Sequence, residues 1–239
     1  MNDQSIVYLI PCTLNETEAS LKSLSPEILS AVQSCSHFFV ENERTTRRFF
    51  KKIWPQMVID DYSWTTIHKA EHNVMHLFCE AIKQNKTIGI VSEAGCPGIA
   101  DPGQILVHKA QSLNGVIIKP LTGPSSLLLA LMASGLNGQQ FCFHGYLPVD
   151  STERKKKIKL LEQKSIAEGS THLFIETPYR NDALLKDILD TLHPDTLLCI
   201  AKDIQGNKET IRTKPIKNWK ANIPSLHKIP VVFIIGKNE

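Results

Sequence analysis

The sequence has neither closely spaced cysteines nor a long apolar run. Its six cysteines form no Cys-x-x-Cys pair, and a chain of 239 residues does not need a disulfide framework. Its longest apolar runs, LLLALMA and VVFIIG, fall short of the roughly 18 residues that span a bilayer. The start, MNDQSIVYLIPC, lacks the basic and apolar segments of a signal peptide. We therefore expect reduced thiols and a soluble, cytoplasmic protein with no membrane partner.

Common ligand signatures are missing as well. After the first apolar run the chain reads IPCTLNE rather than Gly-x-Gly-x-x-Gly, and no Walker loop occurs, which argues against a phosphate cradle. His68, His72 and His76 are spaced to share one helix face, but the His-Glu-x-x-His order is absent, so we expect no metal. The net charge is only +3, so any nucleic-acid contact must come from a local patch.

What is present is an ordinary globular composition, with 42% hydrophobic and 21% charged residues. Short β-branched or aromatic runs alternate with segments of helical period, which predicts an α/β fold with a largely parallel sheet. The predicted strands are residues 5–10, 37–41, 57–61, 87–92, 115–121, 141–145, 171–176, 196–201, 209–213 and 230–236. The predicted helices include one that opens at Ser25-Pro26-Glu27, one around 106–110 and one over 180–192.

The composition of the chain changes at residues 145–157, where GYLPVD leads into the very basic segment STERKKK. We place a domain boundary there, which gives an N-terminal α/β domain over residues 1–147 and a C-terminal α/β domain over 148–239. Two Gly/Pro loops follow predicted strands of the first domain, VSEAGCPGIADPG at 91–103 and LTGPSSLLLA at 121–130. Ligands bind outside the carboxyl ends of the strands in open α/β sheets, so these loops are the predicted binding site.

Several motifs in one order resemble the tetrapyrrole methylase superfamily of S-adenosylmethionine-dependent methyltransferases, and most of all its ribosomal RNA small subunit methyltransferase I branch. The two Gly/Pro loops, FCFHGYLP and ERKKKIKLLE are similar to the branch's Ser-Asp-Ala-Gly-Thr-Pro loop, Pro-Gly-Pro-Ser/Cys-Ala helix start, Gly-Phe-Leu-Pro connector and basic helix. VENERTTRRFF and FIETPYR resemble its Glu-Asp-Thr-Arg and Tyr-Glu-Ser/Ala-Pro-His-Arg segments.

The resemblance implies two α/β domains with the cofactor in the cleft between them, a homodimer, and methylation of a cytidine 2′-hydroxyl in small-subunit ribosomal RNA. Carried over residue by residue, the cofactor contacts fall on Ile10, Cys96, Ile99, Ser125, Ser126 and Glu176. The chain departs from the branch in its first loop, where Cys12-Thr13-Leu14-Asn15 replaces Pro-Ile-Gly-Asn, and at Glu93, where the branch has Asp.

A ribose hydroxyl is a poor nucleophile, so a carboxylate within reach would help as general base. Glu93 is the predicted catalytic residue, with Glu41 and Glu43 as the alternatives. Two basic clusters predict phosphate contacts. The predicted RNA-binding residues are Arg44, Arg47, Arg154, Lys155, Lys156 and Arg180. Two other functions stay open, a tetrapyrrole or protein methyltransferase of the same superfamily, and a cofactor- or RNA-binding module without turnover.

Overall fold

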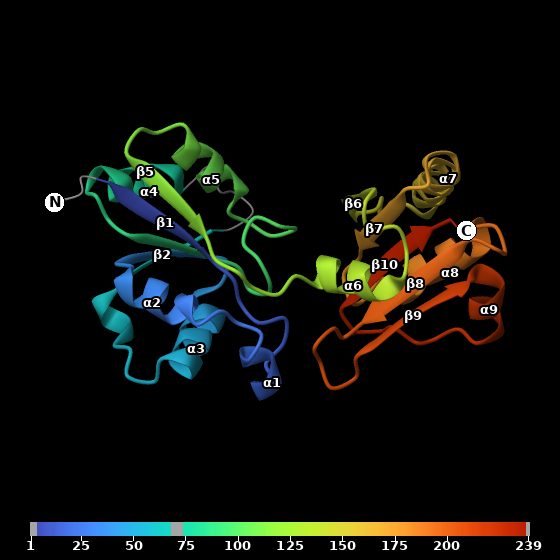
Figure 1. Ribbon diagram of the computed structural model, residues 1–239, viewed down its shortest axis with the longest axis horizontal. Helices are drawn as coiled ribbons and strands as arrows, with labels where there is room; N and C mark the ends of the chain where they lie inside the picture. The colour runs from blue at the N-terminus through green and yellow to red at the C-terminus, as the bar shows by residue number, and fades with distance from the viewer. Residues whose placement is uncertain (1–3, 68–73, 238–239) are drawn as a thin grey trace. The chain divides into compact units, whose positions relative to one another are not determined.

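A computed structural model describes residues 4–67 and 74–237 of the chain. The chain divides into two compact units, Met1–Ser125 and Ser126–Glu239, each with its own five-stranded sheet (Figure 1). The division therefore falls before the boundary at 147/148 that the composition predicts. Residues 126–146 belong to the second unit because they form a helix that packs on the second sheet and a strand that joins it.

The first sheet is wholly parallel, as predicted, with the strand order β3-β2-β4-β1-β5. Its strands are β1 (Ser5–Ile10), β2 (His37–Val40), β3 (Ser63–Thr66), β4 (Ile88–Val91) and β5 (Val116–Pro120). The predicted strand at residues 57–61 is wrong, because Ile59–Asp61 forms a 3-10 turn and the edge strand follows it at β3. Parallel strands all end at one edge of the sheet, so the loops after β1, β2, β4 and β5 gather there.

Helices cover both faces of this sheet (Figure 1). The helices are α1 (Glu18–Leu21), α2 (Glu27–Ser34), α3 (Glu43–Ile53), α4 (Met75–Lys83) and α5 (Gln104–Gln111). On one face, α2 and α3 pack around Phe38 and Phe50, whose ring centroids are 4.9 Å apart. On the other face, α4 and α5 pack around Phe39 and Phe78, whose ring centroids are 5.3 Å apart. Because both faces are buried, the strands read as short continuous apolar runs.

The second sheet is mixed, with the order β6-β7-β10-β8-β9. Only β6 and β7 run parallel, and the other neighbours are antiparallel. Its strands are β6 (Phe141–Tyr146), β7 (Thr171–Ile175), β8 (Leu197–Lys202), β9 (Thr210–Pro215) and β10 (Val231–Gly236). Its helices are α6 (Ser126–Ser134), α7 (Ser151–Glu168), α8 (Asn181–Thr191) and α9 (Ile216–Ala221).

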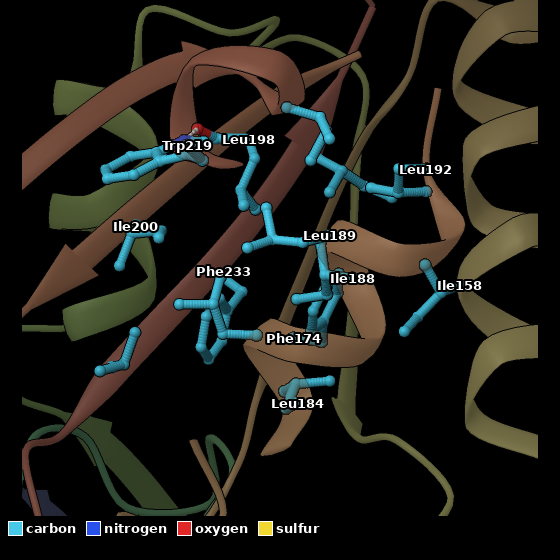
Figure 2. Packing of buried hydrophobic residues seen from close by; sticks show 14 of the residues in the cluster. Ile158, Phe174, Leu184, Ile188, Leu189, Leu192, Leu198, Ile200, Trp219 and Phe233 are labelled. Carbon is cyan, nitrogen blue, oxygen red and sulfur yellow. Dashed lines mark hydrogen bonds between the residues drawn. The ribbon is translucent and has the colours of Figure 1, made fainter. Parts of the chain in front are cut away.

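The core of the second unit lies where α7, α8 and α9 cover one face of this sheet. Figure 2 shows the side chains of Phe174 and Phe233 next to one another within this cluster, and their ring centroids are 6.0 Å apart. The indole of Trp219 closes the cluster at α9 and donates a hydrogen bond of 2.9 Å to the carbonyl of Leu198. α6 packs against β8, β9 and β10, and Leu136, just after it, lies close to Gly236.

Candidate functional site

Three loops at the carboxyl edge of the first sheet contact one another through backbone and side-chain hydrogen bonds. Cys12, after β1, and Gly95, after β4, form an isolated antiparallel bridge with N···O distances of 2.9 and 3.2 Å. The hydroxyl of Ser92 donates to the carbonyl of Gly95 at 3.0 Å, and the thiol of Cys96 lies 3.5 Å from the carbonyl of Pro124, after β5. The first loop therefore reaches the glycine loop although it lacks the family's own glycine.

Glycines permit this approach at particular points. Gly95 has φ +71° and Gly103, which begins α5, has φ +118°, conformations that L side chains rarely adopt. At Gly123 the limit is space, because a Cβ there would lie 2.3 Å from the ring of Pro11. The loops after β1, β4 and β5 thus hold a close-packed arrangement that larger residues would disrupt.

The predicted cofactor residues of the first unit lie in or beside these loops. The side chain of Ile10 is fully buried in the core, so a ligand there could meet only its main chain. Cys96 is half-buried, and burial, with the charge of Asp101, raises the pKa of its thiol. Ile99 is 53% exposed and Ser125 ends the unit. The structure brings these positions to one edge of the sheet, and their contact with a cofactor stays a prediction.

The remaining predicted cofactor residues belong to the second unit. Ser126 begins α6, and Glu176 follows β7. One carboxylate oxygen of Glu176, Oε1, accepts from the backbone of Thr177 at 2.6 Å and from the Arg180 guanidinium at 2.7 and 3.1 Å. The other oxygen, Oε2, is buried with no hydrogen-bond partner in the part of the chain that the structure describes. A buried carboxylate oxygen of this kind can take a donor from a bound molecule.

Three carboxyl groups converge at the edge of the first sheet. Glu41, after β2, accepts from the backbone of Glu93 at 3.1 Å, and Glu93 accepts from the hydroxyl of Thr45 at 3.1 Å. Burial, and then the charges of Glu41 and Glu93, raise the pKa of Asp101 to about 7. Burial also raises the pKa of Glu41. Mutual repulsion in a partly desolvated site keeps a proton available near neutral pH.

Sequence reasoning named Glu93 and Glu41 but missed Asp101. The position of Asp101 in the same Gly/Pro loop as Glu93 was the available signal, because loops of one sheet edge lie together. The other predicted base, Glu43, is engaged elsewhere. It pairs with Arg47 at 2.7 Å and accepts from the hydroxyl of Thr66 at 3.2 Å.

Cys12 shows why the changed first loop carries no reactive thiol. Its side chain is 3% exposed. Burial and the neighbouring charges, with Asp101 the largest, raise the pKa of this thiol well above its usual value. A thiol that does not ionise is a poor nucleophile, so Cys12 serves as a packing residue.

The predicted RNA-binding residues of the first unit lie on α3. Its first turn is capped by Asn42, whose side chain accepts from the backbones of Arg44 and Thr45. Arg44 is exposed. Arg47 is held by Glu43 and lies 4.9 Å from the centre of the Trp64 ring, a cation–π distance. α3 therefore carries one solvent-facing arginine and one arginine fixed by its neighbours.

The basic start of α7 contains one buried cation. The side chain of Arg154 is only 8% exposed, donates to Asp187 at 2.5 and 2.7 Å, and also donates to the carbonyls of Pro148 and Val149. A guanidinium with its donors engaged in this way is not free to meet a phosphate. The structure thus makes Arg154 a residue that joins α7 to α8, rather than the RNA contact that the sequence predicted.

The lysines that follow Arg154 are more accessible. Lys155 is 40% exposed beside Asp187 and Asp190, at 3.4 and 3.5 Å, and Lys156 is 69% exposed and pairs with Glu153 at 2.8 Å. Exposed pairs of this kind are weak and can exchange partners. Arg180, in the same unit, is tied to Glu176.

Two further predictions concern metals and membranes. His68 and His72 lie outside the described residues, so the predicted histidine face cannot be followed in the structure. Within residues 4–67 and 74–237, no group of three or more His, Cys, Asp or Glu side chains is placed to hold a metal ion. None of the helices described is both long and apolar enough to cross a membrane.

Comparison with proteins of known sequence gives consistent matches. The Ribosomal RNA small subunit methyltransferase I of Vibrio cholerae is 29% identical over 98% of this chain and 78% of its own length. The protein of the same name from Haemophilus influenzae is 33% identical over 69% of this chain, and the match spans 58% of its own length. That from Bacillus subtilis is 28% identical over 90% of this chain and 65% of its own length.

Solved structures show the same fold at low identity. A diphthine synthase superposes with a TM-score of 0.67 at 14% identity, over 98% of this chain and 91% of that chain. A uroporphyrin-III C-methyltransferase from Thermus thermophilus, in complex with S-adenosylhomocysteine, superposes with a TM-score of 0.60 at 14% identity, over 98% of both chains. The sequence model described as Tetrapyrrole (Corrin/Porphyrin) Methylases matches residues 19–218. The chain therefore belongs to the tetrapyrrole methylases, a family of S-adenosylmethionine-dependent methyltransferases.

Proposed function

We propose that this protein transfers a methyl group from S-adenosylmethionine to a ribose 2′-hydroxyl of small-subunit ribosomal RNA. The observation that carries the proposal is the match to proteins named Ribosomal RNA small subunit methyltransferase I, which in the Vibrio cholerae relative extends over 98% of the chain. The fastened loops of the first unit and the acidic group beside them supply a site for that chemistry.

The residues present fit a cofactor that carries amino groups. Glu176 Oε2 is a buried acceptor without a donor, and an ammonium or exocyclic amine would satisfy it. The main chain at Ile10, the loop at Cys96 and Ile99 and the hydroxyl of Ser125 in the first unit, with the hydroxyl of Ser126 in the second unit, complete the proposed binding set. S-adenosylmethionine would supply an electrophilic methyl carbon. The family's arrangement, with the cofactor between the two domains, is part of this proposal.

The work left to the protein is to position the hydroxyl and accept its proton. Methyl transfer is an in-line displacement, so the chain must hold the nucleophile in near-attack geometry. We assign to Glu93 the role of accepting the proton of the ribose hydroxyl, because its carboxylate borders the pocket formed by the first loop and α3. Asp101, whose pKa is raised to about 7 by burial and then by Glu41 and Glu93, adds negative charge to this acidic group when it ionises.

The proposed RNA contacts are cations of each unit. Arg44 and Arg47 contribute from α3, and Lys155 and Lys156 contribute from α7. Arg180 can contact a phosphate only if it shares its guanidinium with Glu176. Binding through such residues releases counterions from the RNA, so affinity should fall steeply with salt.

Two further features accompany the proposal. Since the substrate is ribosomal RNA, the protein would act in the cytoplasm. The resemblance to the family adds a homodimer, and sedimentation of the purified chain at micromolar concentration would test it, with a monomer as the contradicting result.

The first experiment is calorimetric titration with S-adenosylmethionine and S-adenosylhomocysteine. Binding at micromolar to millimolar ligand supports the proposal, and its absence contradicts the cofactor assignment. The second is transfer of tritiated methyl to free small-subunit RNA, to 30S particles and to a tetrapyrrole precursor. Label on RNA or particles supports the proposal. Label on the tetrapyrrole alone would replace it with the other activity of the superfamily.

A further inference from the structure

An exposed aromatic side chain lies in the turn between β7 and α8 of the second unit. Tyr179 is 70% exposed, so its ring contributes little to the core. It directly precedes Arg180, whose guanidinium is bonded to Glu176, the proposed acceptor for the cofactor. Tyr179 is not among the proposed cofactor or RNA contacts, although it lies only three residues from Glu176 in the sequence.

Two hydrogen bonds hold residues 226–229 against this turn. The backbone N–H of Lys228 donates to the carbonyl of Pro178 at 2.9 Å. The side-chain amide of Asn181 donates to the carbonyl of Ile229 at 2.7 Å, and Asn181 is fully buried, so this second bond is shielded from water. The turn and the segment 226–229 therefore keep a fixed position relative to each other within the second unit.

Lys228 adopts an unusual backbone conformation at this contact. Its φ is +61°, in the left-handed region that a residue other than glycine adopts only at a cost in free energy. Its ammonium nitrogen lies 5.8 Å from the centre of the Tyr179 ring, a cation–π distance. The ring of His227 makes a T-shaped contact with the same ring, with centroids 6.0 Å apart. A strained residue that holds a cation beside an exposed ring points to a role for this surface.

We use the name tyrosine surface for the exposed ring and its neighbours, Tyr179, Arg180, His227 and Lys228. Lys228 is exposed and the side chain of Arg180 is 40% exposed, so the ring has cations on its border. An acidic protein segment needs only the cations, whereas a nucleotide uses both features, because its base stacks on the ring and its phosphate meets a cation. Bases within a duplex are already stacked on their neighbours. The tyrosine surface therefore fits an unpaired nucleotide.

We propose that the tyrosine surface binds an unpaired nucleotide of the RNA, with its base stacked on the ring of Tyr179 and a phosphate beside Lys228. Every base has a face that can stack, so this nucleotide need not be the one whose ribose is methylated. The inference rests on the proposed function. It adds a requirement on the conformation of the substrate, namely that the RNA bound by the second unit is single-stranded.

The test measures the affinity of the protein for three probes at one salt concentration. They are a single-stranded RNA of about twelve nucleotides that contains only adenosine and cytidine, the same strand annealed to its complement, and inorganic polyphosphate. Tyr179→Ala removes the ring, and Tyr179→Phe keeps the ring and removes its hydroxyl. The matched control is Tyr146→Ala, because Tyr146 is another exposed tyrosine of the second unit, at the end of β6.

We expect the wild type to bind the single strand more tightly than the duplex. Tyr179→Ala should weaken binding of the single strand about tenfold, whereas Tyr179→Phe and Tyr146→Ala should change it by less than about twofold. Polyphosphate has no base, so Tyr179→Ala should bind it as the wild type does. Duplex bound as tightly as single strand, an unchanged affinity in Tyr179→Ala, or an equal loss for RNA and polyphosphate would each overturn the inference.

Methyl transfer separates this inference from the proposed function. If the wild type transfers no methyl group to RNA but Tyr179→Ala still loses affinity for the single strand, the proposed function fails while the tyrosine surface stands. If methyl transfer occurs and Tyr179→Ala leaves the KM for RNA unchanged, the tyrosine surface fails while the proposed function stands. Tyr179→Ala should also bind S-adenosylmethionine as tightly as the wild type, and weaker binding would assign the ring to the cofactor instead.

Discussion

The carboxyl group of Asp101 makes a specific prediction about stability and pH. Its pKa is raised from 3.8 to about 7, first by burial and then by Glu41 and Glu93. The folded protein therefore keeps a proton that the unfolded chain loses near pH 4. Stability associated with this group is present below about pH 4, declines as pH rises, and is fully lost above about pH 7. Asp101→Asn removes the buried charge and should relieve this loss.

The magnitude follows from the size of the shift. One pKa unit corresponds to about 1.4 kcal/mol, so the whole shift sets an upper limit of about 4 kcal/mol. The carboxyl is partly exposed, and solvent screening reduces the expected gain to about 1–2 kcal/mol at pH 8. At pH 5 the gain should be smaller, because the unfolded carboxyl is already ionised there while the folded one keeps its proton, and the loss goes on growing as pH rises toward the folded pKa.

Urea unfolding at pH 5 and pH 8, followed by tryptophan fluorescence, measures this difference. Asp60→Asn provides the control, because Asp60 is exposed and its charge lies outside the group formed by Glu41, Glu93 and Asp101. An increase in the free energy of unfolding of Asp101→Asn that is the same at both pH values, or no increase at pH 8, would contradict the raised pKa of Asp101. The methyl-transfer rate gives a second readout. It should rise with pH around 7 in the wild type and lose that rise in Asp101→Asn.

Three further predictions concern the loops and the basic helix. Asp187→Ala leaves the buried Arg154 unpaired and should destabilise the protein by about 3 kcal/mol in urea, and a loss under 1 kcal/mol would contradict the role given to that pair. Gly123→Ala places a Cβ against the ring of Pro11, so calorimetry should show about tenfold weaker binding of S-adenosylmethionine. Gly138 has open space around it, so Gly138→Ala should leave this affinity unchanged. Equal effects of the two substitutions would contradict the loop arrangement. Lys156→Glu should reduce the slope of log affinity for RNA against log salt by about 1, and an unchanged slope would place the RNA surface elsewhere.

Much of the fold could be predicted from local pattern. The apolar runs identify the strands of both sheets except β3, and Ser25-Pro26-Glu27 marks the start of α2. β3 was missed because it is a short edge strand of polar and aromatic residues, whereas the preceding segment 57–61 is more apolar. The change of composition at residues 145–157 and the division of the chain after Ser125 differ, because composition does not show the pairing of residues 141–146 with the second sheet.

The candidate site was predictable only in part. The Gly/Pro loops point to the edge of the sheet, since the strand order brings their ends together. The roles of Asp101 and Arg154 depend on burial and partners that sequence does not show. A basic cluster predicts phosphate binding, yet one of its members is buried against Asp187.

The most direct test of the proposed function is alkaline hydrolysis of small-subunit RNA after incubation with the protein and tritiated S-adenosylmethionine. Alkali cleaves RNA through the free 2′-hydroxyl, so a methyl group on that oxygen protects the adjacent bond. The proposal predicts that the label is recovered in an alkali-resistant dinucleotide. Recovery of the label only in mononucleotides would show methylation of a base, and no label in RNA or 30S particles would contradict the proposed substrate.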